Sequence, residues 1–180
     1  MKAITIWQPW ASLIATGEKV YETRGWPTKY RGPIAIHAAL KDVLRLPITP
    51  ELEKYALHND KIGPWIWLPH GKIIAIGELV NCWRIVYHPG PDADEAKHIP
   101  IGAESMVDKK HEPGFGDYIV PDEKELALGN WDPEDGRNGM RYAWEIRNVK
   151  LLENPVPIRG RQGLWNWDEV IPEPVDASPF

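Results

Sequence analysis

A chain of 180 residues, 43% of them hydrophobic and 26% charged, has the composition of a folded protein and is too apolar to be intrinsically disordered. Its net charge of −5 weighs against strong, sequence-independent binding to a long polyanion. One cysteine rules out a disulfide within the chain, and no apolar run is long enough to cross a membrane. We therefore expect a cytoplasmic protein that does not bind membranes.

Tryptophan and proline are unusually frequent, with ten and 18 residues respectively against only two phenylalanines. Proline interrupts long helices, whereas tryptophan is enriched in strands, so the composition favours short helices and β structure. The length suits a single domain. We expect that domain to span residues 1–167 and to be followed by an acidic tail, residues 168–180, that frays.

The first predicted elements are a strand and a short helix. Residues 1–6 carry β-branched side chains at alternate positions, which indicates a strand. Pro9 suits the first turn of a helix over residues 10–16, because its missing N–H group costs nothing there. Gly17 ends that helix, and residues 19–26 leave it in an extended or looped form.

Four further segments have clear signals, and one long segment has none. Residues 31–39 and 71–84 are apolar enough to be buried strands, and residues 141–152 alternate as a strand does. Residues 49–58 begin with a capping threonine and a proline, which predicts a helix. Residues 88–117 are polar and aperiodic, which predicts a long loop. Strands and short helices without regular alternation indicate an α+β domain or a small barrel.

The histidines and the cysteine form no recognisable metal site. No pair of the six histidines has the i,i+4 spacing of a helical zinc site. Two histidines and two aspartates between residues 88 and 98 fall in the long loop, where a solvated surface explains them. Cys82 lies in an apolar run, which indicates a buried and unreactive thiol. We expect no metal and no cofactor, and the sequence has neither a G-x-S-x-G motif nor a glycine-rich phosphate loop.

A cluster of charge lies between tryptophans near the start of the sequence, and two interpretations of it stay open. In the structural one, Lys19 sits near the carbonyl end of the helix, where a cation is favoured. Glu22 and Arg24 then form a weak surface ion pair. In the functional one, the three side chains line a cleft. A cation, a carboxylate and a planar guanidinium beside indole rings would read an unstacked base and hold its phosphate.

Several motifs occur in order along the chain. They are QPWASLI at residues 8–14, G-x-K-x-x-E-x-R from Gly17 to Arg24, Trp26, Thr28, RGPIAIHAA at 31–39, GELVNC at 77–82 and RGRQGLW at 159–165. Together they resemble the activating signal cointegrator 1 homology domain, or ASCH domain. The resemblance extends from residue 4 to about residue 167, and residues 88–135 contain no motif that can be matched.

The resemblance implies both a fold and a class of ligand. The implied fold is α+β: a small, partly open PUA-like β-barrel with short flanking helices, a central cleft and a long loop insertion. The implied partners of the cleft are RNA, single-stranded nucleic acid or a nucleotide-like ligand. Transferred by motif, the ligand-binding positions are Trp7, Gln8, Trp10, Lys19, Glu22, Arg24, Trp26, Arg159, Arg161 and Gln162, and His37 and Glu78 also belong to matched motifs.

Two alternatives to a binding module follow from the same resemblance. Some small bacterial members of the family are amidohydrolases that act on acetylated cytidine, with a lysine and, three positions later, a threonine. Here Glu22 occupies the threonine position and Thr23 follows it. The first alternative is therefore an amidohydrolase of a modified nucleoside with Lys19 and Glu22 as catalytic residues. The second is a protein-interaction module in which the cluster is structural and a protein partner binds the long loop.

Overall fold

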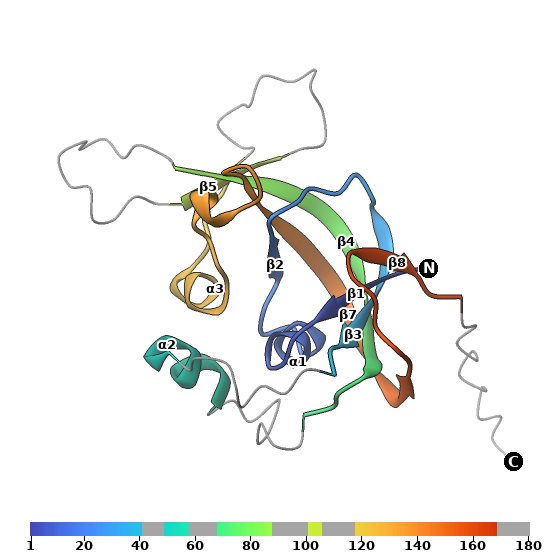
Figure 1. Cartoon of the computed structure of the whole chain (residues 1–180). Helices are drawn as coiled ribbons and strands as arrows, with labels where there is room; N and C mark the ends of the chain where they lie inside the picture. Colours follow the sequence, from blue (N-terminus) through green and yellow to red (C-terminus); the bar gives the residue numbers. More distant parts are fainter. Residues whose placement is uncertain (41–48, 58–67, 88–100, 106–117, 169–180) are drawn as a thin grey trace, which may run out of the picture.

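The computed structural model describes residues 1–40, 49–57, 68–87, 101–105 and 118–168 (Figure 1). The described strands are β1 (Lys2–Ile6), β2 (Tyr21–Arg24), β3 (Gly32–Ala38), β4 (Lys72–Tyr87), β5 (Ile101–Ser105), β6 (Tyr118–Ile119), β7 (Arg141–Pro157) and β8 (Leu164–Asn166). The helices are α1 (Trp10–Ala15), α2 (Pro50–Leu52) with a π-helical continuation η2 (Glu53–Leu57), α3 (Glu123–Leu128) and the 3-10 turn η4 (Pro133–Asp135).

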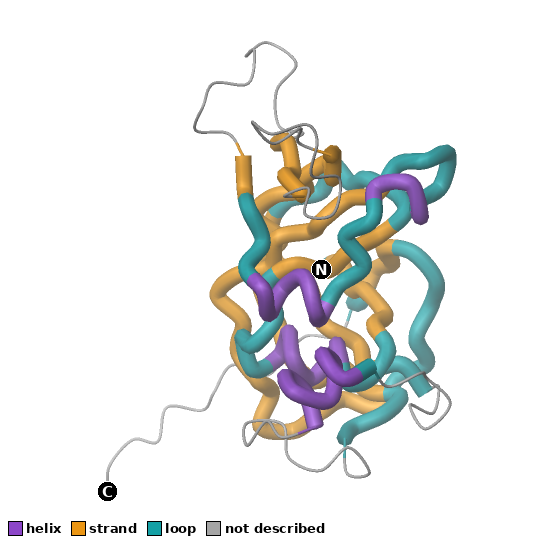
Figure 2. The backbone as a smooth tube through the Cα atoms, turned by 90° about the vertical axis from the view of Figure 1, so that its left-hand side faces the viewer, coloured by secondary structure: helices purple, strands orange, loops and turns teal. Residues whose placement is uncertain are grey.

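All described strands join one mixed sheet, and most of the short helices lie close to one another, with one helical turn standing apart (Figure 2). Six strands follow the order β2-β7-β4-β3-β1-β8, and β5 and β6 extend the sheet beside β4. β1 pairs with β3 in parallel, whereas the other described pairs are antiparallel. At Gly77, where β4 and β7 shift register, an added Cβ would lie 2.9 Å from Ile146 Cγ2, so the two strands approach this closely because glycine is present.

The α+β class is confirmed, but the described strands do not close into a barrel. β2 and β8 end the strand order, and β2 pairs only with β7 while β8 pairs only with β1. Both end strands are short, with four and three residues. Side chains from these two ends, Arg24 of β2 and Leu164 of β8, line the same cavity. A cavity therefore lies where β2 and β8 would have to pair to close a barrel.

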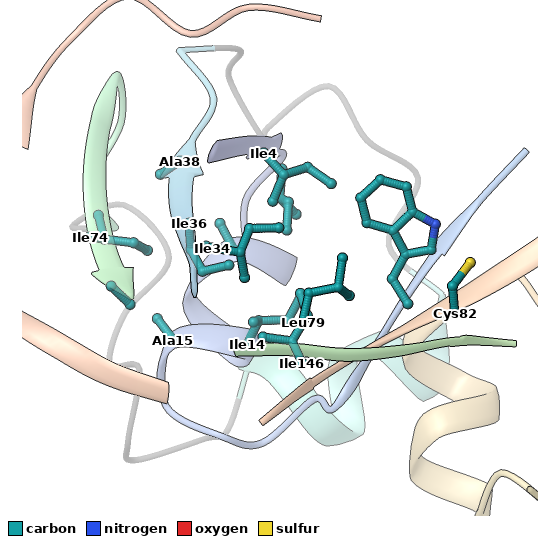
Figure 3. Close-up of a cluster of buried hydrophobic side chains, with 14 of the residues drawn as sticks. Ile4, Ile14, Ala15, Ile34, Ile36, Ala38, Ile74, Leu79, Cys82 and Ile146 are labelled. Atoms are coloured by element: carbon teal, nitrogen blue, oxygen red, sulfur yellow. The ribbon is translucent and has the colours of Figure 1, made fainter. Parts of the chain in front are cut away.

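The core lies between α1 and the concave face of the sheet. Figure 3 shows isoleucines from β1, β3, β4 and β7 converging on Ile14 and Ala15 of α1. Three residues of β7 predicted to share a face, Tyr142, Trp144 and Ile146, are all buried, which confirms that pattern. The thiol of Cys82 is fully buried in the same cluster, as expected, and burial raises its pKa.

Most of the other predicted elements are present, and several extend further than predicted. The N-terminal strand and the helix after Pro9 form as expected, while β4 and β7 run beyond the predicted ends at residues 84 and 152. The predicted loop over residues 88–117 is wrong at β5, which pairs with β4. Its remaining residues, like the predicted tail after 168, lie outside the described part of the chain.

One helix was not predicted, although a local signal for it exists. α3 is capped by Asp122, whose carboxylate accepts a hydrogen bond from the N–H group of Glu125 at 2.8 Å. A capping aspartate followed three residues later by glutamate is a typical start of a helix. None of the described helices is long and apolar enough to cross a membrane.

Candidate functional site

The turn after α1 brings the charged N-terminal cluster into the fold. Gly17 has φ +75°, a left-handed conformation that favours glycine and ends the helix. The N–H group of Lys19 then bonds to the carbonyl of Leu13 at 3.0 Å, so the chain runs back beside α1. β2 begins at Tyr21 and places Glu22 and its neighbours opposite β7. The predicted extended exit from the helix is confirmed.

Lys19 is buried rather than solvated near the end of the helix. It is 2% exposed, and its Nζ lies 3.6 Å from Oε2 of Glu125, which is 5% exposed. The other carboxylate oxygen, Oε1, accepts a hydrogen bond from the N–H group of Val20. The contact between Lys19 and Glu125 is an ion pair too long for a hydrogen bond, and among the described residues Nζ has no hydrogen-bond partner. Glu125 is not among the residues predicted from the sequence, because the helix that carries it was not predicted.

Glu22 and Arg24 form the expected ion pair, but not at the surface. Arg24 Nε lies 3.0 Å from Glu22 Oε1, and Glu22 is 8% exposed. The guanidinium also donates from Nη2 to the carbonyl oxygen of Thr5 at 2.8 Å. Arg24 is thereby fixed between β1 and β2. A partly buried, anchored pair keeps its geometry better than a solvated pair does.

Two adjoining cavities surround these side chains, and Thr5, Trp7 and Arg24 line both. The smaller cavity has a volume of about 670 Å³ and contains the two buried charges, Lys19 and Glu22. Its walls are completed by polar and apolar side chains from several elements and their connections: Trp10, Thr23, Thr49, Leu52, Leu128, Asn130 and Arg141.

The larger cavity, of about 1270 Å³, has a strongly basic lining. Four arginines line it, and none of the described aspartates and glutamates does. Among the described residues Arg137, Arg159 and Arg161 have no carboxylate partner, whereas Arg24 has Glu22. Guanidinium groups without carboxylate partners are available to bind phosphate or carboxylate groups of a ligand.

The loop of residues 158–163, which carries two of these arginines, is fixed to the sheet by side chains of β1 and β3. Thr5 Oγ1 donates to the carbonyl of Arg161 at 2.9 Å, and His37 Nε2 lies 2.9 Å from the carbonyl oxygen of Ile158. Gly160 packs directly on the imidazole: an added Cβ would lie 2.4 Å from His37 Cε1. The loop can approach the sheet this closely only with glycine at that position.

His37 is 1% exposed, and burial lowers its pKa below the ordinary value of 6.5. The hydrogen bond to Ile158 acts in the opposite direction but is the smaller effect. The imidazole is therefore neutral at pH 7, with Nε2–H donating to the carbonyl oxygen. His37 thus holds the backbone of the arginine loop against the sheet without adding a charge to the cavity.

Nine of the ten sequence-predicted ligand-binding residues line one or both cavities, and their contacts with a ligand remain predictions. The exception is Gln8, which is fully buried; its Nε2 donates to the carbonyl of Pro69 and its Oε1 accepts from the N–H group of Ser12. His37 lines the larger cavity, whereas Glu78 lies elsewhere and accepts a hydrogen bond from Asn148. The described part of the chain contains no group of three histidine, cysteine, aspartate or glutamate side chains placed to hold a metal ion.

Comparison with known proteins shows the family of the chain. A family model described as the ASCH domain matches residues 4–155. The chain belongs to the ASCH domain family. No curated protein matches the chain significantly. The ASCH match includes the cluster from Lys19 to Arg24 but ends before the arginine loop, so that loop lies outside the part of the chain matched by the family model.

Replacing Lys19 by methionine should destabilise this ASCH domain by about 3 kcal/mol, because Glu125 would be left buried without its counter-ion. The double variant Lys19→Met/Glu125→Gln should recover most of that loss, since the introduced glutamine is neutral and its amide oxygen still accepts from the N–H group of Val20. Urea unfolding of the two variants and the parent measures both effects. Equal destabilisation in the single and double variants would show that the pair is not coupled.

The free energy of unfolding should fall as the pH is lowered below about 6.5. At these pH values His37 is protonated in the unfolded chain but stays neutral in the folded protein, where its pKa is lower. His37→Gln keeps a donor near the Nε2 position and cannot titrate. The difference in stability between parent and variant should therefore be constant above pH 7 and change below pH 6.5 in favour of the variant. Chemical unfolding across this range measures it, and parallel curves throughout would contradict it.

Proposed function

We propose that this ASCH domain binds single-stranded nucleic acid, in the first instance RNA, across the two adjoining cavities. Membership of the family supports nucleic-acid binding in general. The same resemblance implies a PUA-like fold with a central cleft. In this proposal the opening between β2 and β8 is that cleft.

The observation that carries the proposal is the charge of the larger cavity. A chain with a net charge of −5 has four arginines in the lining of one cavity, where the structure places no described carboxylate. A local basic surface on an acidic protein favours polyanion binding at that surface, because the net negative charge disfavours binding elsewhere. Arginine also matches phosphate geometry with two parallel hydrogen bonds, which suits it to hold a nucleic-acid backbone.

Aromatic side chains beside the arginines favour a single strand over a duplex. Trp7 lines both cavities and is 43% exposed, whereas Trp26 lines the larger cavity and packs edge-on against Trp144 at 4.5 Å between ring centroids. Exposed indoles stack on unpaired bases, and each stacked base contributes roughly 1–3 kcal/mol. In a duplex the faces of the bases are already stacked and unavailable.

An amidohydrolase remains the second candidate, because Lys19, Glu22 and Thr23 line one cavity. Their contacts favour binding over hydrolysis. Lys19 is paired with Glu125, and Glu22 is paired with Arg24, so both charges already have counter-ions. The Thr23 hydroxyl accepts a hydrogen bond from the N–H group of Asn130 at 3.1 Å, and no described base lies within hydrogen-bond distance of it. The third candidate, a protein-interaction module with a purely structural cluster, accounts for the pair of Lys19 and Glu125 but not for the arginine cavity.

The double variant Arg159→Ala/Arg161→Ala should bind a single-stranded RNA oligonucleotide more weakly and with less salt dependence. The slope of log affinity against log salt should fall by about 1.4, because each phosphate contact on a single strand contributes roughly 0.7. Fluorescence anisotropy over a salt series measures this. The matched control is Arg84→Ala, an exposed arginine on β4 outside both cavities, which should leave affinity and slope unchanged. No RNA binding by the parent protein would refute the proposal.

If the domain only binds its ligand, acylated cytidines incubated with it should be recovered intact. Chromatography of the nucleoside after incubation gives the measurement, and heat-denatured protein gives the background. Turnover that Glu22→Gln abolishes would instead establish the hydrolase, since that variant keeps the shape of the side chain but removes its charge.

A further inference from the structure

The two cavities share a wall but differ in chemistry. Among the described residues, the larger one has four arginines and no carboxylate, whereas the smaller one combines one carboxylate and three cationic side chains with threonine hydroxyls, one amide and apolar surface. Its volume of about 670 Å³ falls within the range of about 300–1,000 Å³ typical of small-molecule sites. The larger cavity, at about 1270 Å³, exceeds that range and is suited to several ligand groups.

Among the residues that line the smaller cavity, Lys19 has a buried hydrogen-bond donor for which the described residues provide no acceptor. The side chain of Lys19 is 1% exposed, and among the described residues its ammonium group has an ion-pair partner but no hydrogen bond. A buried donor without a hydrogen bond lowers the stability of the protein, and an acceptor on a bound ligand would remove that loss. Glu22 supplies an acceptor in the same cavity, and Trp10 and Leu128 supply apolar surface. A donor and an acceptor beside apolar walls match the edge and the faces of a nucleobase.

Arg24 stands at the junction of the two cavities. Its side chain lines both and is fixed by Glu22 at 3.0 Å and by the carbonyl oxygen of Thr5 at 2.8 Å. A ligand that occupies both cavities would pass this guanidinium, which would contact the part of the ligand that links its two ends. In a nucleotide, that connection is the sugar and its phosphate.

We propose that one nucleotide of the bound strand turns out of the stack, so that its base enters the smaller cavity beside Lys19 and Glu22. Its phosphate lies against Arg24, and the neighbouring phosphates follow Arg159 and Arg161 through the larger cavity. The inference rests on the proposed function and adds the division of the site. The smallest complete ligand is then a single nucleoside monophosphate, because one base and one phosphate occupy both sides of the junction.

Competition against a labelled single-stranded RNA oligonucleotide tests the division. Nucleoside 5′-monophosphates should displace the oligonucleotide more effectively than the matching nucleoside or ribose 5-phosphate, by about tenfold or more, because each of those lacks one half of the contacts. Ribose 5-phosphate that competes as well as the monophosphates would overturn the inference, since the base would then contribute nothing.

Two variants separate the contributions of the cavities. Lys19→Met/Glu125→Gln, which removes the buried amine together with its counter-ion, should weaken binding of monophosphates about tenfold while the salt slope of oligonucleotide binding stays unchanged. Arg159→Ala/Arg161→Ala should lower the salt slope of oligonucleotide binding. The order in which the different nucleoside monophosphates compete should stay the same. Arg84→Ala again serves as the control. A salt slope that falls in the Lys19 variant would place a phosphate rather than a base at the buried amine, against the inference.

The outcomes distinguish this inference from the proposed function. Oligonucleotide binding without competition by any monophosphate keeps the proposed function and overturns the inference. Monophosphate binding without oligonucleotide binding keeps the division of the site and overturns the proposed single-stranded ligand. Circular dichroism shows whether each variant is folded. The competition experiment needs only the parent protein, so its result does not depend on the folding of any variant.

Discussion

The buried ion pair between Lys19 and Glu125 is the contact on which the site depends. It joins the segment after α1 to α3 across 106 residues of sequence, and the second carboxylate oxygen of Glu125 binds the backbone at Val20. Burying two charges is expensive, so a hydrophobic pair would serve stability equally well or better. Its physical consequence is different: the pair attaches α3, whose end supplies Leu128 to the smaller cavity, and it leaves an ammonium group beside that cavity.

The open sheet provides the second half of the site. Because β2 and β8 pair on one side only, Arg24 at one end strand and the loop of residues 158–163 before the other line the larger cavity. The loop is not a free surface segment, since Thr5 and His37 bind its backbone and Gly160 packs on the imidazole. Its arginines therefore project from a fixed backbone, and under the proposed function this reduces the entropy lost on ligand binding.

Local signals predicted much of the fold, and non-local contacts account for what was missed. The end of α1 at Gly17, the strand containing Glu22 and the buried face of β7 follow from nearby residues alone. The role of Glu125 does not, because the sequence around Lys19 contains nothing that identifies a partner 106 residues away. Barrel closure fails for the same reason: it depends on how far apart the end strands β2 and β8 lie, which no single segment encodes. Gln8 was placed at the ligand by motif, yet its amide groups bond to Pro69 and Ser12.

The arginine loop lies beyond the match to the family model but is built on residues within it. Thr5 and His37 belong to the matched residues 4–155, and both bind the backbone of the loop rather than its side chains. Backbone contacts fix where the loop lies and leave the identity of residues 159, 161 and 162 free to vary without loss of the support. Gly160 is the exception, because any side chain there would collide with the imidazole. The matched region thus supplies the smaller cavity, the support and two of the four arginines, while the loop adds the other two, so under the proposed function phosphate affinity can change through side chains that carry no part of the core.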